Sequence, residues 1–229
     1  NTPIGITYTV ATHLAESNAA MQARFASGRM SKNDFQSFLN DLDESLQLLL
    51  SNTRRATELI KSFKMMAVDQ TSGERRIFNL RDYIEEVLLN LRPRLKKTAH
   101  RISVECPADL QMDSYPGALA QILANLILNS VTHAYSEDQA GHLMIQVIQP
   151  DADHVKLRYS DDGCGIPLEQ QSQVFEPFFT TQRNNGGSGL GLHLVYNLVT
   201  GVLQGQLHLR SQPGQGTTFT IRFRRIASS

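Results

Sequence analysis

The sequence predicts an α+β protein, with an N-terminal antiparallel helical hairpin followed by an α/β sandwich. Residues 1–67 carry apolar side chains at steps of three and four, which is the period of a helix that buries one face. From residue 79 onward, helical patterns alternate with short β-type runs. This order favours helices packed against a sheet, rather than a doubly wound parallel sheet.

The hairpin is predicted from two helical stripes separated by a turn. The first stripe covers residues 4–26 and the second covers 31–66. Ser31 and Asp34 have the spacing of a capping box, which marks the start of the second helix. The second stripe is too long for the first helix to cover, so we expect a second copy of the hairpin to complete a four-helix homodimer. A monomeric hairpin folded onto the rest of the chain is the alternative.

A polar stretch containing Ser72 and Gly73 separates the two parts. We therefore assign residues 1–67 to the hairpin, 68–78 to a linker and 79–226 to a second domain.

The second domain is predicted to contain three helices and six strands. The helices are expected at 80–98, 116–133 and 189–203, the first of them capped by Asn79 and kinked at Pro93. The strands are expected at 101–106, 110–113, 143–149, 154–160, 205–211 and 217–224, and the last two form a closing β pair.

Bulk composition narrows the classes of function. Lys and Arg number 22, as do Asp and Glu, so no net field attracts nucleic acid or an acidic membrane surface. We find no apolar run of roughly 20 residues and no signal-peptide pattern, so we expect a cytoplasmic chain. An inner-membrane parent is compatible with this expectation, through parts that lie outside the sequence. Cys106 and Cys164 lack the spacing of a disulfide framework or zinc site.

Three polar residues share one face of the apolar helix predicted at 116–133. Asn125 and Asn129 are four residues apart, and His133 follows one turn later. A neutral amide oxygen can complete the coordination of a magnesium ion carried by a nucleotide, and His133 could meet a phosphate. A single buried Asn more often satisfies nearby backbone, but three polar residues in register favour a site.

Asp161 ends a predicted strand and opens the sequence Asp-Asp-Gly-x-Gly. Gly163 and Gly165 allow the backbone to approach a ligand closely. A carboxylate at this position can accept a hydrogen bond from an exocyclic amine such as N6 of adenine. The same residues are also typical of an ordinary turn.

A glycine-rich run precedes the helix predicted at 189–203. Its backbone N–H groups could face an anion at the start of the helix, as in phosphate-binding loops, although such a run can also be a plain linker. The phenylalanine-rich segment 175–179 could anchor one end of a mobile segment. Arg183 could then reach a terminal phosphate or simply remain solvated.

In their order and spacing, four motifs resemble the N, G1, F and G2 boxes of bacterial sensor histidine kinases, members of the GHKL ATPase superfamily. They are NLILNSVTHA, DDGCGI, FEPFFTT and GGSGLGL, and the resemblance spans roughly residues 76–225. Gyrase and mismatch-repair ATPases share the nucleotide fold but lack the hairpin and the FEPFFTT run. The resemblance implies that the second domain binds MgATP, and that the γ-phosphoryl group passes to a histidine and then to an aspartate of a response regulator.

The resemblance also implies roles for individual residues. Asn129 would be the magnesium ligand with Asn125 beside it, and Asp161 would hold the adenine amine. The remaining implied nucleotide contacts are Gly163, Gly165, Ile166 and Thr217 at the adenine end, and His133, Arg183, Gly187, Gly189, Leu190, Gly191 and Leu192 toward the phosphates.

The chain departs from the family pattern at two positions in the N box. Ser130 replaces a usual alanine, and Thr132 lies where many relatives have a basic residue. His133 or Arg183 would then carry more of the phosphate charge. The lid over residues 181–186 is short, so we expect little gating by it.

The opening NTPIG is similar to the end of the family stretch His-Glu-x-Asn-Thr-Pro-x-Gly. On this resemblance, the phosphoacceptor histidine would lie three residues before Asn1. Thr2 falls where the family places a residue linked to dephosphorylation of the response regulator. His13 is expected to be a surface residue. Two other hypotheses stay open, a nucleotide-binding dimeric scaffold without catalysis and a hydrolytic ATPase.

Overall fold

The computed structural model describes residues 2–68, 74–96, 98–136, 139–180 and 189–227. It divides the described chain into two units. One unit holds the helical residues up to Met65, and the other begins at Met66 and holds the described strands. We describe each unit by itself.

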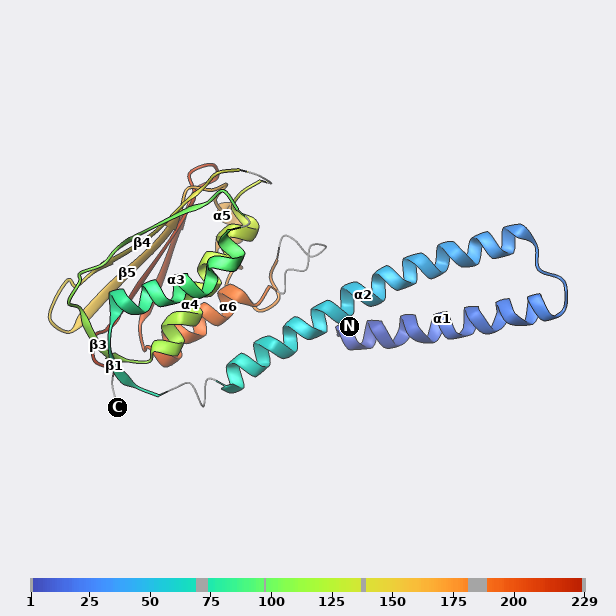
Figure 1. Ribbon diagram of the computed structural model, residues 1–229, viewed down its shortest axis with the longest axis horizontal. Coiled ribbons are helices and arrows are strands. Elements are labelled where there is room, and N and C mark those ends of the chain that lie inside the picture. Colours follow the sequence, from blue (N-terminus) through green and yellow to red (C-terminus); the bar gives the residue numbers. More distant parts are fainter. Residues whose placement is uncertain (1, 69–73, 97, 137–138, 181–188, 228–229) are drawn as a thin grey trace. The chain divides into compact units, whose positions relative to one another are not determined.

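The first unit is the predicted hairpin of two helices, α1 (Pro3–Ala26) and α2 (Lys32–Val68) (Figure 1). Thr2 caps α1, because its side chain accepts a hydrogen bond from the N–H of Gly5 at 3.2 Å. The predicted capping box of α2 is confirmed. The N–H of Asp34 donates to Ser31 Oγ, and the N–H of Ser31 donates to Asp34 Oδ2, both at 3.1 Å.

The hairpin leaves much of its apolar surface uncovered. No residue of α1 is buried, and Ile4 and Tyr8 are 67% and 75% exposed. Leu46 and Leu50 of α2 are 44% and 59% exposed. A single hairpin therefore does not bury the stripes that define its helices.

The second unit is built on a five-stranded sheet. The strand order is β2 (Arg101–Glu105), β4 (His142–Ile148), β5 (His154–Asp161), β7 (Thr217–Arg224) and β6 (Gln206–Ser211). The pair β2–β4 is parallel and the other pairs are antiparallel, so the sheet is mixed. A separate antiparallel pair joins β1 (Arg76–Asn79) to β3 (Gln111–Ser114).

Helices pack on one face of this sheet (Figure 1). They are α3 (Leu80–Leu95), α4 (Pro116–His133) and α6 (Gly191–Asn197), with a π-helical turn over Leu198–Val202 after α6. A short helix, α5 (Leu168–Gln171), contributes no buried residue. As predicted, Asn79 caps α3 by accepting a hydrogen bond from the N–H of Asp82 at 3.1 Å. The α+β class with a helix-covered sheet is thus confirmed.

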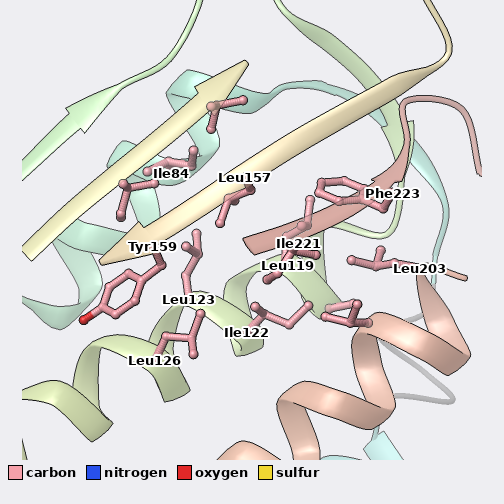
Figure 2. Packing of buried hydrophobic residues seen from close by; sticks show 14 of the residues in the cluster. Ile84, Leu119, Ile122, Leu123, Leu126, Leu157, Tyr159, Leu203, Ile221 and Phe223 are labelled. Carbon is pink, nitrogen blue, oxygen red and sulfur yellow. The ribbon is translucent and has the colours of Figure 1, made fainter. Parts of the chain in front are cut away.

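The core lies between α4 and the inward face of the sheet. On β5 and β7, buried residues alternate with more exposed ones, as expected for strands with only one covered face. Figure 2 shows Leu119, Ile122 and Leu123 of α4 packed beneath Leu157 and Ile221 of the strands. This packing fixes α4 beneath the end of β5, where the site residues lie.

Several elements differ from the sequence prediction. Helix α3 ends at Leu95, three residues before its predicted end. β1 occupies Arg76–Asn79, within what was predicted to be a linker, because an edge strand of four residues with Ile77 73% exposed carries too little alternation to be recognised. The last helix begins at Gly191, two residues later than predicted, and ends in the π-helical turn. The short helix α5 was not predicted. Among the helices of the described ranges, none is both long enough and apolar enough to cross a bilayer.

We expect Leu126→Ala to destabilise the second unit by about 2–5 kcal/mol, because Leu126 is fully buried and its truncation leaves a cavity. The matched control is Leu89→Ala on α3, where the side chain is 57% exposed and the expected change is within about 0.5 kcal/mol. Urea unfolding followed by near-ultraviolet circular dichroism of the tyrosines measures both. Equal midpoints for the two variants would contradict this account of the core.

Candidate functional site

Asp161 is a buried carboxylate at the end of β5 and the centre of the site. It is 8% exposed and accepts three hydrogen bonds. Oδ2 accepts from Ser130 Oγ at 2.7 Å, and Oδ1 accepts from the N–H groups of Gly163 at 3.1 Å and Thr217 at 3.2 Å. The Thr217 contact follows from the sheet register, which pairs Asp161 with Thr217 across β5 and β7.

The two adjacent aspartates of the Asp-Asp-Gly motif have opposite electrostatic environments. Burial raises the pKa of Asp161, and its three hydrogen-bond donors oppose that rise. Asp162 is exposed; partial burial works to raise its pKa, but the N–H of His142 and the hydroxyl of Tyr135 outweigh this and keep the pKa below its usual range. Asp162 therefore ties the start of β4 to the end of α4, whereas Asp161 faces inward.

The turn after Asp161 is held from two sides. The N–H of Cys164 donates to the carbonyl of Ala134 at 2.7 Å, and the carbonyl of Cys164 accepts from the N–H of Gly214 at the β6–β7 turn, also at 2.7 Å. Gly165, the next residue, has φ +71°, and a β-carbon there would clash with the Gln212 carbonyl oxygen. Only glycine fits this close approach.

Ser211 is a site residue that the sequence analysis missed. Its hydroxyl accepts a hydrogen bond from the N–H of Ile166 at 2.8 Å, donates to the carbonyl of Gly216 at 2.8 Å, and lies 3.0 Å from Thr217 Oγ1. It thereby joins the turn to the start of β7. The β6–β7 register pairs Ser211 with Thr217, so only knowledge of that register would have indicated it.

The two asparagines of α4 converge on the start of α6. A β-carbon at Gly191 would lie 3.6 Å from Asn125 Oδ1 and 3.8 Å from Asn129 Oδ1. Asn125 Nδ2 donates to the carbonyl of Gln121 at 2.9 Å, which turns its oxygen away from the helix backbone. The structure therefore places two amide oxygens beside Gly191, as the shared helix face predicted.

These amide oxygens suit magnesium better than a softer metal. Oxygen ligands are the ones that Mg²⁺ prefers, and it usually takes few of them from protein when phosphates supply the rest. Among the described residues, no group of three His, Cys, Asp or Glu side chains could hold a metal ion alone. The residues present therefore fit an ion that arrives with a phosphate ligand.

His133 lies in the last turn of α4 and is half-buried. Burial lowers the pKa of its imidazole, and its Nδ1 is buried with no hydrogen-bond partner in the described ranges. A neutral imidazole offers a hydrogen bond rather than a positive charge. His133 therefore contributes little charge near pH 7, contrary to the expectation that it would carry more of the phosphate charge.

The segment before α6 is fastened to the phenylalanine-rich run. The N–H of Phe178 donates to the carbonyl of Gly189 at 2.9 Å. Gly189 has φ +68°, and a β-carbon there would lie 2.5 Å from the Phe178 carbonyl carbon. Leu190 is buried at the start of α6 and Leu192 packs against the core.

Some predicted site residues cannot be placed in this arrangement. Arg183, Gly187 and the lid over residues 181–186 lie outside the described residues. Thr2 is described and caps α1, but it belongs to the first unit.

The two cysteines are not paired with each other. Cys106 is half-buried, which raises the pKa of its thiol to about 11, and Cys164 is an exposed free cysteine.

Comparisons with known proteins show which family and which fold this chain resembles. Residues 115–226 match the family described as histidine kinase-, DNA gyrase B- and HSP90-like ATPase. The sensor histidine kinase RcsC of Escherichia coli K12 is 28% identical over 169 residues, which are 71% of this chain and 17% of RcsC. The chain thus spans less than a fifth of the length of this relative.

Two solved structures share the fold. The catalytic domain of the histidine kinase ThkA aligns with a TM-score of 0.58 at 25% identity, covering 67% of this chain and 97% of that domain. The histidine kinase AdeS of Acinetobacter baumannii aligns with a TM-score of 0.58 at 20% identity, covering 95% of this chain and 96% of AdeS. The AdeS alignment, at its lower identity, concerns the fold alone.

Proposed function

Because residues 115–226 form a histidine kinase-, DNA gyrase B- and HSP90-like ATPase domain homologous to sensor histidine kinases, we propose that this chain is the kinase core of a two-component sensor. In this proposal, it binds MgATP and transfers the γ-phosphoryl group to a histidine, from which an aspartate in the receiver domain of a response regulator takes it. The observation that carries the proposal is the buried Asp161 carboxylate, bound by Ser130 of α4, the helix that also carries Asn125 and Asn129.

Asp161 would recognise the adenine base. An ionised carboxylate is acceptor-only, so it pairs with an exocyclic amine and repels the carbonyl oxygen that guanine carries at the same position. Gly163, Gly165 and Ile166 shape the turn beside it, and Thr217 would reach the base through a water molecule. The buried surroundings strengthen this single polar contact.

Asn129 would bind the magnesium ion, with Asn125 beside it. When bound, the ion neutralises phosphate charge and draws electron density from the transferred group. The backbone of Gly187, Gly189, Leu190, Gly191 and Leu192 would line the phosphates, with His133 as a neutral donor and Arg183 as the cation.

The chain's own contribution to phosphoryl transfer would be to position groups and stabilise charge. Among the described residues near Asn125 and Asn129, none is an obvious general base. The amide oxygens and backbone N–H groups would hold the phosphates in line with an incoming histidine nitrogen, and the turn after Asp161 would fix the far end of the nucleotide.

The hairpin would pair with a second copy to form a four-helix bundle. The exposed apolar side chains of α1 and α2 support this, because a lone hairpin leaves them in water. The phosphoacceptor histidine would precede Asn1, and Thr2 would serve dephosphorylation of the response regulator.

We expect Asp161→Asn to lower ATP affinity at least tenfold while the fold persists, because the amide cannot replace an acceptor-only carboxylate and has its own donors to satisfy. Isothermal titration calorimetry with ATP, with and without Mg²⁺, measures this. The control is Asp153→Asn, at an exposed position before the opposite end of β5. Absence of ATP binding by the folded wild-type chain would overturn the proposal and favour a scaffold.

Asn129→Ala should abolish most of the gain in ATP affinity that Mg²⁺ provides, because it removes a metal-facing oxygen, while metal-free ATP affinity stays near that of the wild type. The ratio of the two dissociation constants, with and without Mg²⁺, reports the effect. An unchanged ratio would show that Asn129 is not the magnesium ligand.

Sedimentation velocity at micromolar concentration should show a homodimer. Leu46→Lys should shift it toward monomer, because a charge replaces a 44% exposed apolar side chain of the stripe. Leu89→Lys on α3 is the control and should leave the dimer intact. A wild-type chain that sediments as a monomer would exclude the four-helix bundle.

A further inference from the structure

A buried polar cluster lies beneath the base-recognition carboxylate. Ser130 of α4 and Asp161 of β5 are 5% and 8% exposed and share a 2.7 Å hydrogen bond. Tyr159, two residues before Asp161 and on the same face of β5, is fully buried. Its hydroxyl has no hydrogen-bond partner among the described residues, although Ser130 lies near enough to act on the pKa of the phenol.

The acceptor positions of Asp161 are nearly all used. An ionised carboxylate offers about four lone-pair positions. Oδ1 receives two N–H groups, from Gly163 and Thr217, and Oδ2 receives one O–H, from Ser130. One acceptor position therefore remains free, and it is on Oδ2, the oxygen that also accepts the Ser130 hydrogen bond.

We propose that Ser130 is a positioning residue for base recognition, because its hydroxyl holds Asp161 so that one acceptor position on Oδ2 is left for an exocyclic amine. This inference rests on the proposed function, since it takes the ligand to be an adenine nucleotide. It assigns a role to the serine that stands where an alanine is usual.

The Ser130 hydrogen points to Asp161 because an ionised carboxylate can only accept a hydrogen bond. A serine hydroxyl has one hydrogen to donate and two lone pairs to accept with. Figure 2 shows the Tyr159 hydroxyl pointing away from Leu123, Leu126 and the other labelled apolar side chains. The single hydrogen of Ser130 is therefore used on the carboxylate, which is the contact that the structure shows.

Ser130 also affects which protonation state of Asp161 meets the base. Burial raises the pKa of Asp161, whereas the Ser130 hydrogen bond favours the ionised form. The other titratable groups that face Asp161 do not change their protonation state near neutral pH. Burial raises the pKa of the Tyr159 and Tyr135 phenols, which stay neutral, and Asp162, with its lowered pKa, stays ionised.

Loss of the hydroxyl has a specific consequence for base selection. A protonated Asp161 becomes a donor, and it can then pair with the carbonyl oxygen that inosine carries in place of the adenine amine. Ser130→Ala should therefore weaken the discrimination between ATP and inosine triphosphate, most strongly at acidic pH. If Ser130 had a merely structural role, its loss would weaken the binding of both nucleotides equally at every pH.

The test is calorimetric titration of the whole chain with ATP and with inosine triphosphate between pH 5.5 and 8. For Ser130→Ala, we expect the ratio of the ATP affinity to the inosine triphosphate affinity to fall below the wild-type ratio at the acidic end and to recover at the alkaline end. Ser130→Thr keeps the hydroxyl and should keep the wild-type pH profile. Ser160→Ala is the matched control, because Ser160 precedes Asp161 on the opposite face of the same strand.

A second readout separates this inference from the proposed function. Carbon-13 NMR of the Asp161 carboxyl carbon, without nucleotide, should show a higher titration midpoint in Ser130→Ala than in wild type. Equal midpoints and parallel pH profiles would overturn the role of Ser130 while ATP binding stands. A wild-type chain that binds neither nucleotide would overturn the proposed function, and this inference with it.

Discussion

The site depends on one constraint, which is that a buried carboxylate must be surrounded by hydrogen-bond donors. Burial raises the pKa of Asp161, and without these donors nothing would oppose that rise. The donors come from three elements that are distant in sequence, namely the hydroxyl of Ser130 on α4, the N–H of Gly163 in the turn and the N–H of Thr217 on β7. The helix packing, the turn and the sheet register must therefore all be correct at once for this one group to be satisfied.

That requirement explains why the surrounding segments are so closely fastened. Ser211 joins the turn to β7, and Ala134 at the end of α4 accepts the N–H of Cys164. Gly165 fits where any β-carbon would meet the Gln212 carbonyl. These contacts hold the donors within reach of Asp161, and they leave Asp162, the adjacent aspartate, to fasten β4 and α4 instead.

The sequence predicted those features that depend on neighbours along the chain. The capping box of Ser31 and Asp34, the cap at Asn79 and the shared face of Asn125 and Asn129 all follow from local spacing, and the structure contains each of them. The features it missed depend on partners in other elements. Strand β1 exists only by pairing with β3, and the role of Ser211 requires the β6–β7 register. The glycine-rich run was predicted to start a helix, but the positive φ of Gly189 and its contact with Phe178 delay that start to Gly191.

Helix α4 connects the stability of the fold to the chemistry of the site. Its apolar side chains, such as Leu123 and Leu126, lie in the centre of the core (Figure 2). Ser130 of the same helix binds Asp161, and the oxygens of its two asparagines lie beside Gly191. Close packing in the core leaves α4 little freedom to slide or rotate. A rotation that carried Ser130 away from Asp161 would also displace fully buried leucines and leave cavities beneath β5 and β7. The position of the carboxylate is thus maintained by hydrophobic packing as well as by its own hydrogen bonds.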